Sequence, residues 1–350
     1  MGAGLMGQNG FPRTRVALAV LALTIVLFIS GCGDDGVLGP GDCGTPPPPE
    51  VDHRDAMRSF VGNISAHARA TTPSFIVIAQ GGLPLLTTGG QPDDPFDAEY
   101  LAALSGIGQE GLYYDLAGGD VPTDPVQRQV MISFLDRITE AGKPVLATSF
   151  CQDHDNMDNV YTSSTARGYL AFAAPSRSLD LIPDYPVSPH RTHDGHVTHL
   201  GDACNYLLLT DPGSHADREG YLAQLGATDH DVLILDADHG GAILTPAEVD
   251  SLRTKQNGGQ RLVLASLAID RAGTHRDYWQ AGWDEDPPSW LTDPLENDPG
   301  STLVQYWSPE WQAIIFGGPE AALDRIVAAG FDGVYLEGLE AYEEFEDADG

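Results

Sequence analysis

The sequence predicts an α/β fold in which eight parallel strands close into a single-domain (β/α)8 barrel. Short, near-continuous apolar runs alternate with stretches of helical periodicity, as expected for strands that helices cover on the outside. Several of these runs end in carboxylates, and barrels of this kind keep their chemistry at the carboxyl ends of the strands. A doubly wound open sheet is the main alternative. No Gly-x-Gly-x-x-Gly motif follows a strand, so nothing indicates a nucleotide site.

The elements follow one another in a regular order. We expect strands at Phe75–Gln80, Gly106–Glu110, Pro144–Phe150, Tyr169–Ala173, Val232–Asp236, Arg261–Ser266, Val304–Trp307 and Gly333–Leu336. Helical periodicity covers Arg54–Ala70, Asp97–Leu104, Val126–Ala141, Asn156–Arg167 and Arg218–Leu225. A further helix should begin at Thr245, which is followed by Pro246 and by Glu248 in the capping-box position, and end near Asn257.

The N-terminal part reads as an export signal and a tether. Two arginines precede a short apolar run that ends at Ile29-Ser30-Gly31-Cys32, which resembles a bacterial lipobox. We therefore expect residues 1–31 to be a lipoprotein signal peptide, Cys32 to be the lipidated residue, and 32–52 to be a Gly/Pro-rich linker before a barrel at 53–350. This predicts an exported bacterial lipoprotein, anchored to the membrane through its N-terminal lipid only, in the periplasm or at the cell surface. An ordinary secretory signal or an anchor helix is the alternative.

The formal charge of −33, from 51 acids against 18 basic residues, argues against nucleic-acid binding. It fits either an acidic, salt-adapted surface or the attraction of a cationic ligand. After Cys32, the three cysteines Cys43, Cys151 and Cys204 allow one disulfide and leave one thiol, and the sequence leaves the pairing open. Four histidines recur every third residue in a Pro-rich loop, a spacing that does not converge on one metal: His190, His193, His196 and His199. We expect no metal and no cofactor.

Several segments together resemble glycoside hydrolase family 114, the endo-α-1,4-polygalactosaminidase-like TIM barrels. They include Phe75–Gln80, Gly106–Glu110, Gly142–Leu146, Asp229–Asp236, Gly258–Ala265 and Gly330–Glu343. Relative to many members, the halves 53–183 and 200–350 are exchanged, as in a circular permutation with its join in the loop from Pro183 to His199. The resemblance implies a surface-anchored glycosidase that hydrolyses a galactosamine-rich, possibly cationic, polysaccharide with retention of configuration.

The resemblance also implies site residues. Glycoside hydrolysis needs two carboxyls that flank the scissile bond. The family match places the acid/base at Glu110 and the nucleophile at Glu337. It places substrate contacts at Gln80, Asp236, Asp270, Tyr306 and Glu340.

The chain also departs from the family pattern. Glu337 and Glu340 stand where relatives usually have Asp, and Arg271 and Gly273 stand where relatives have acids. A catalytically inactive barrel that binds carbohydrate at the cell surface is therefore the alternative.

Overall fold

The structure is a computed structural model that describes residues 51–115, 120–215, 217–295, 298 and 300–349. These residues belong to one compact unit. The expected signal segment 1–31, the expected lipidation site Cys32, Cys43 and nearly all of the expected linker lie outside the described residues. None of the helices in the described part is long and apolar enough to cross a membrane.

Eight parallel strands form the central sheet. They are β1 (Ile76–Gln80), β2 (Gly106–Gln109), β3 (Val145–Phe150), β4 (Leu170–Ala174), β5 (Leu207–Leu209), β6 (Val232–Asp236), β9 (Leu262–Ala268) and β13 (Gly333–Glu337). Their order is β4-β3-β2-β1-β13-β9-β6-β5, so the chain visits them in turn around a circle. The last strand pairs with the first, with Val334 opposite Val77, and only the β4–β5 seam lacks a hydrogen-bonded ladder. The sheet is thus a nearly closed α/β barrel, as the sequence predicted.

The described part of the chain contains nine α-helices, and the first six begin after a residue whose side chain caps the N-terminus. They are α1 (His53–Thr71), α2 (Ala98–Ala103), α3 (Pro125–Glu140), α4 (His154–Ala166), α5 (Arg218–Gly226), α6 (Pro246–Leu252), α7 (Pro309–Ile315), α8 (Ala322–Ala328) and α9 (Ala341–Asp349). An aspartate side chain accepts backbone N–H groups at the N-termini of the first five. The capping box predicted at Thr245 is present. Part of the chain's acidity therefore serves helix capping.

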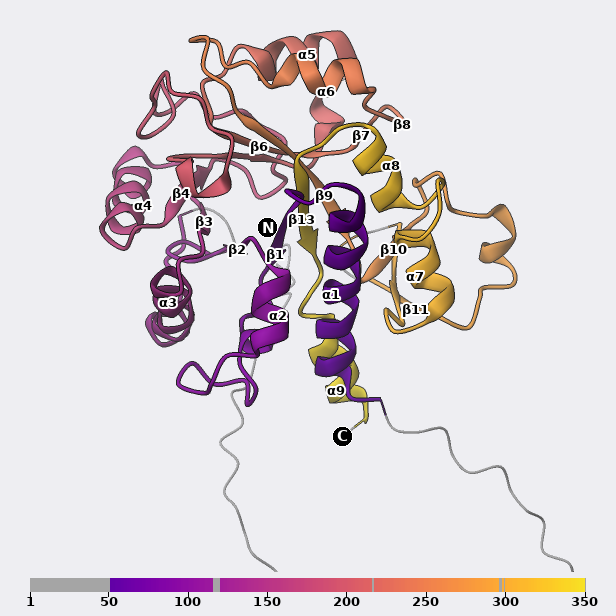
Figure 1. Cartoon of the computed structure of the whole chain (residues 1–350). Coiled ribbons are helices and arrows are strands. Elements are labelled where there is room, and N and C mark those ends of the chain that lie inside the picture. The colour runs from indigo at the N-terminus through magenta and orange to yellow at the C-terminus, as the bar shows by residue number, and fades with distance from the viewer. Residues whose placement is uncertain (1–50, 116–119, 216, 296–297, 299, 350) are drawn as a thin grey trace, which may run out of the picture. The chain divides into compact units, whose positions relative to one another are not determined.

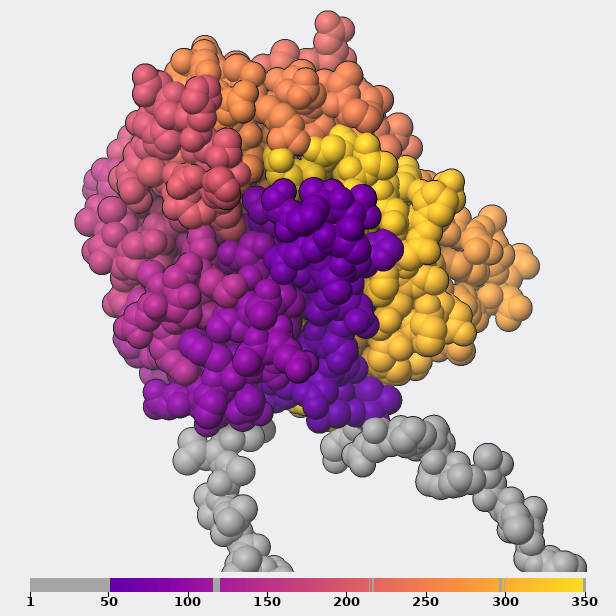
Figure 2. Space-filling view, viewed as in Figure 1, coloured from indigo at the N-terminus to yellow at the C-terminus, as the bar shows by residue number. Residues whose placement is uncertain are grey.

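The two ends of the unit meet on one side of the barrel. Helix α1 contacts α8 and α9, and Figure 1 shows α9 at the lower end of α1. In the space-filling view the indigo N-terminal segment lies directly against the yellow C-terminal segments (Figure 2). Barrel closure by β1 and β13 therefore joins the beginning and the end of the unit.

One predicted barrel strand was wrong. The run Val304–Trp307 overlaps β12 (Ser301–Val304), which pairs antiparallel with β10 (Arg271–Gly273) and β11 (Leu291–Pro294) outside the barrel. The missing barrel strand is β5, whose three residues follow the Pro-rich loop. Helix α6 also ends earlier than predicted, at Leu252. A short hairpin of β7 (Asp238–His239) and β8 (Ala242–Ile243) follows β6.

Candidate functional site at the barrel mouth

Polar side chains gather where the barrel strands end. Gln80 and Asp236 are the last residues of β1 and β6, Glu110 directly follows β2, Asp270 lies two residues beyond β9, and Glu337 ends β13. Because every ladder of this sheet is parallel, these positions share one end of the barrel, which we call the mouth. The sequence predicted that these residues lie at the carboxyl ends of the strands, and the observed strand bounds agree.

A pocket of about 860 Å³ opens at this end. We call it the mouth pocket. Its charged lining consists of the carboxylates Asp211, Asp236, Asp238, Asp277, Asp298 and Glu337, the guanidiniums Arg177, Arg271 and Arg276, and His275. Six carboxylates against three guanidiniums leave the lining with a net negative charge. The field in the mouth pocket therefore favours cationic or hydroxyl-bearing ligands over anionic ones.

Arg271, at the start of β10, bridges three acids. Its Nη2 donates to Glu337 Oε2 at 2.7 Å, and its Nη1 donates to Asp270 Oδ1 at 3.0 Å. Its Nε lies 3.5 Å from Asp298 Oδ2. Burial alone would lower the pKa of Arg271, but the neighbouring Asp270 and Glu337 carboxylates reverse that effect and raise it. Arg271 is thus a permanent cation at the mouth.

A second arginine holds the neighbouring strand end. Arg276 donates to both carboxylate oxygens of Asp236, at 2.9 Å each, in a bidentate pair, and also reaches Asp238 Oδ2 at 3.3 Å. The Asp238 backbone N–H donates to Asp236 Oδ1 as well, at 2.9 Å. With its two oxygens bound in this way, Asp236 is a structural acid that fixes the loop after β6.

Glu110 differs from the other acids because its carboxyl accepts no hydrogen bond from any described residue. Burial raises its pKa to about 8, and the negative charges of Glu337 and Glu340 add to the shift, against Arg271 and Arg177. Burial also raises the pKa of Tyr335, which lies inside the barrel, and Glu110 is the next largest cause. Glu110 is therefore a protonated carboxylic acid at neutral pH, set above an aromatic barrel interior.

Burial also raises the pKa values of Glu337, Asp270, Asp238 and Glu340, the last to about 7. Burial raises the pKa of Glu337, and the Asp270 and Asp236 charges add to it, while Arg271 opposes the shift. Burial likewise raises the pKa of Asp270, again against Arg271. Gly338 follows Glu337 with a φ of 85°, and a Cβ at that position would overlap the Asp270 carboxyl. The glycine therefore permits the close approach of the loops after β9 and β13.

Of the predicted catalytic and substrate-contact residues, Asp236 and Glu337 line the mouth pocket, whereas Glu110, Asp270 and Glu340 do not. Glu340 is exposed, and one of its oxygens accepts the Gly82 backbone N–H at 3.2 Å, so it links the loop after β13 to the loop after β1. Gln80 does not line the mouth pocket. Tyr306 does not line it either. Its side chain is fully buried, and its hydroxyl donates to the His53 carbonyl at 2.8 Å. Tyr306 thus packs the beginning and end of the unit together.

Sequence reasoning missed the guanidiniums as parts of the site. Arg271 was noted only as a departure from a family pattern that has an acid at this position, and Arg276 was given no role. A signal was present, because two of the 18 basic residues stand within eight positions after a strand that ends at the mouth. In a chain with 51 acids, such a concentration indicates paired carboxylates nearby.

A second polar cluster lies at the opposite end of the barrel. His193, Cys204 and Asp231 offer ligand atoms within 4.8 Å of one another. Asp231 is fully buried, and its oxygens already accept Lys255 Nζ at 3.0 Å, Cys204 N at 2.8 Å and His193 Nε2 at 3.0 Å. This network balances the Asp231 charge and holds the 183–199 loop against the barrel. Cys151 and Cys204 are free thiols, so the expected disulfide does not join these two.

Comparison with known proteins gives no functional assignment. No family model matches the chain. It is 39% identical over 106 residues to an uncharacterized protein of Deinococcus radiodurans, which covers 30% of this chain and 32% of the relative. It is 39% identical over 83 residues to an uncharacterized protein of Methanocaldococcus jannaschii (24% and 23%), and 26% identical over 120 residues to one of Thermotoga maritima (34% and 36%). The matches thus span 23% to 36% of the length of these relatives, and their names assign no activity.

Proposed function

We propose that this barrel is a surface-anchored glycoside hydrolase of the endo-α-1,4-polygalactosaminidase type, which acts with retention on a galactosamine-rich polysaccharide. The observation that carries the proposal is a pair of carboxyls in contrasting environments at the barrel mouth. Glu110 is unpaired, with a pKa raised to about 8, whereas Glu337 is bound to a guanidinium at 2.7 Å.

The contrast supplies the two roles that glycoside hydrolysis needs. A carboxyl that stays protonated at neutral pH can donate its proton to the leaving oxygen, as Glu110 would. Burial raises the pKa of Glu337 and its contact with Arg271 opposes that shift, so the guanidinium favours the ionised form that the attacking group needs. In a retaining mechanism Glu337 would attack the anomeric carbon, and Glu110 would then accept a proton from the water that releases the sugar.

The charge of the mouth pocket supports the proposed substrate class. Its lining has more carboxylates than guanidiniums, and the whole chain carries a formal charge of −33. A deacetylated galactosamine polymer is cationic and hydroxyl-rich, so both its charge and its hydrogen-bonding groups suit such a pocket. Lipidation at Cys32 would keep the barrel at the membrane surface, where an exported polysaccharide is accessible.

One observation favours the alternative of a carbohydrate-binding barrel without catalysis. Arg271 donates hydrogen bonds to the carboxylates of Glu337 and Asp270 at the same time, at 2.7 Å and 3.0 Å. A carboxylate held this tightly is a weaker nucleophile, unless substrate binding draws the guanidinium away. Arg271 therefore decides between the two functions.

The test uses deacetylated polygalactosamine and the full chain without its signal segment. Hydrolysis predicts new reducing ends, with the product anomer retained by NMR, and at least a 100-fold loss of rate in both Glu110→Gln and Glu337→Gln. Glu140→Gln, an exposed acid on α3, is the matched control. Binding without new reducing ends would establish the carbohydrate-binding alternative. If the protein neither binds nor cleaves the polymer, both proposed functions are refuted.

A further inference from the structure

The Arg271 guanidinium lies between three carboxylates that differ in their access to solvent. The Asp270 side chain is 11% exposed, that of Glu337 is 21% exposed and that of Asp298 is 50% exposed. Arg271 donates from Nη1 to both oxygens of Asp270, at 3.0 Å and 3.3 Å, and from Nη2 to Glu337 at 2.7 Å. Its Nε lies 3.5 Å from the Asp298 carboxylate. Two inner acids and one outer acid therefore share a single cation.

The Arg271 side chain has room to turn outward and a partner to turn to. It is 26% exposed, and it lines the mouth pocket together with Glu337 and Asp298. A guanidinium that leaves the inner acids can stay on Asp298, the outer one. Asp270 and Glu337 then need another cation, because two ionised carboxylates in a partly buried site repel each other. Since β10 lies outside the barrel, this movement leaves the barrel strands in place.

A primary ammonium group meets the requirements of the replacement cation. It carries one positive charge and three N–H donors, so it can serve both inner carboxylates, as the guanidinium does. A hydroxyl or an acetamide brings hydrogen bonds but no charge, and it would leave the two acids without a counter-charge. In galactosamine the amine stands on the carbon next to the anomeric carbon. An ammonium held by Asp270 and Glu337 would therefore bring the reacting carbon to Glu337.

We propose that Arg271 is a specificity-determining residue of the mouth pocket, whose guanidinium gives up its place between Asp270 and Glu337 to the ammonium group of an amino sugar. Neutral sugars do not make this exchange, so the pocket selects sugars with a free amine. The inference rests on the function proposed for the mouth pocket, and it names the cationic group that the pocket recognises. Arg271 keeps the two inner acids paired until such a sugar arrives.

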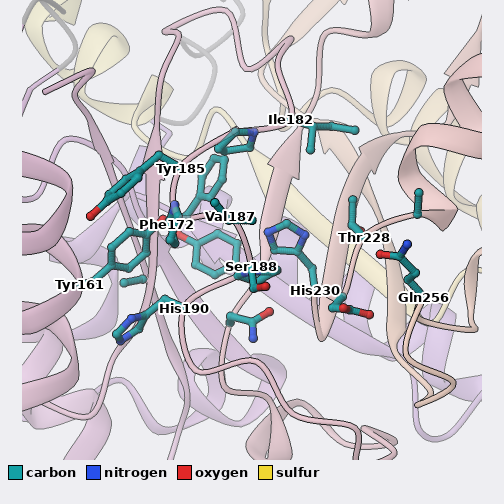
Figure 3. A pocket seen from close by; sticks show the side chains of 18 of the residues that line it. Tyr161, Phe172, Ile182, Tyr185, Val187, Ser188, His190, Thr228, His230 and Gln256 are labelled. Carbon is teal, nitrogen blue, oxygen red and sulfur yellow. The ribbon is translucent and has the colours of Figure 1, made fainter. Parts of the chain in front are cut away.

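A second pocket of the barrel lacks such an arrangement. It has a volume of about 370 Å³ and lies in the wall at the β4–β5 seam, where the sheet has no ladder, and we call it the seam pocket. Figure 3 shows the side chains of Tyr161, Tyr185 and His230 around it. No Lys or Arg occurs among the described residues that line it, and its one carboxylate, Asp229, accepts the Asn257 N–H at 2.8 Å. An ammonium ion is therefore expected at the mouth pocket and not at the seam.

The test compares the binding of galactosamine with that of galactose, which has a hydroxyl in place of the amine, by isothermal titration calorimetry at about pH 6, where a sugar amine is protonated. The natural protein should bind galactosamine weakly, because the sugar must displace an internal cation. Arg271→Ala vacates the position, so its affinity for galactosamine should be about tenfold higher or more, while its affinity for galactose should not change. Free guanidinium ion at low concentration should compete with galactosamine in this variant, because it restores the missing group.

Three variants separate the exchange from other effects. Arg177→Ala removes the same charge from the mouth pocket, but Arg177 is exposed and forms no hydrogen bond or ion pair with a described residue. A general electrostatic gain would therefore be as large in Arg177→Ala as in Arg271→Ala. Arg271→Lys keeps the charge and should bind galactosamine as weakly as the natural protein does. Ala227→Trp fills the seam pocket from the exposed end of α5 and should leave galactosamine binding unchanged.

The natural protein provides a second readout, which does not depend on whether Arg271→Ala folds. The NMR signal of the Arg271 Nε–H group, identified by its absence in Arg271→Lys, should shift when galactosamine is added and not when galactose is added. Three results would overturn the proposal: an equal gain in Arg177→Ala and Arg271→Ala, equal affinity of Arg271→Ala for the two sugars, or an Arg271 signal that does not respond to galactosamine. Hydrolysis of the polymer together with any of these results would refute the exchange and leave the proposed function standing.

Discussion

Replacing Glu110 by Gln should stabilise the barrel, and the gain should grow with pH. The native pKa of Glu110 is about 8, against an ordinary value of 4.5. Because the native pKa lies above the unfolded one, the unfolded chain releases this proton first, and stability is lost as pH rises from 4.5 through 8. At 1.36 kcal/mol per pH unit, the loss is roughly 3 kcal/mol at pH 7 and roughly 5 kcal/mol at pH 9. Glutamine has nearly the same shape and cannot ionise, so the variant avoids this loss.

Thermal unfolding of both proteins between pH 4 and pH 9 measures the effect. At about 2–4 °C per kcal/mol, the Tm of Glu110→Gln should exceed that of the natural protein by roughly 10 °C or more at pH 9, and the two should agree closely at pH 4. Glu140→Gln, an exposed position of α3, should show no such trend. A difference in Tm that stays constant across this pH range would show that the Glu110 carboxyl is not held neutral by burial, and the acid role proposed for it would fail with it.

Three further substitutions test other parts of the structure. Lys255→Met should lower the free energy of unfolding, measured with urea, by about 3–5 kcal/mol, because it leaves Asp231 buried without its cation. Adding Asp231→Asn should recover part of that loss, and additive effects of the two substitutions would contradict the pairing. Gly108→Ala should cost about 1–3 kcal/mol, because its Cβ would lie 2.7 Å from Tyr335 Cζ, and less in a Tyr335→Leu background, so an equal cost in both would refute the overlap. Thr245→Ala should lower the free energy of unfolding by about 1 kcal/mol, and no change would mean that the capping box contributes nothing.

Most of the barrel could be predicted because its strands are buried on both sides. Strands such as Val232–Asp236 and Gly333–Glu337 are near-continuous apolar runs of ordinary length. The strand β5 is only three residues long, and a run of that length is found in many loops. Val304 belongs to an apolar run of the same kind, but it pairs in an antiparallel sheet. The apolar pattern of a strand shows that it is buried but not which strand it pairs with. It therefore could not show that β5 belongs to the barrel and that Val304 does not.

The site was predictable to the level of the strand ends and no further. The positions of Glu110 and Glu337 follow from their place after strands, which the sequence shows. The ion pairs of Arg271 depend on where β10 turns back over the mouth, and that is decided by its pairing with β12. Tyr306 illustrates the opposite limit. The family resemblance placed a substrate contact at Tyr306, but the burial of this side chain against the N-terminal helix depends on barrel closure between segments far apart in the chain.

The acidity of the chain has two distinct consequences in this fold. Away from the mouth, many carboxylates are committed to structure: aspartates cap helices, and Asp332 binds Arg253 at 2.6 Å and the Val263 N–H at 2.8 Å. Such acids carry charge but are not available to a ligand. The mouth pocket has six carboxylates and three guanidiniums in its lining, so half of the negative charge is not balanced. Glu110 remains protonated until the pH approaches 8. Attraction of a chain that keeps its positive charge should therefore come from the unpaired acids of the mouth and strengthen above that pH, because ionisation of Glu110 then adds a further negative charge beside Glu337.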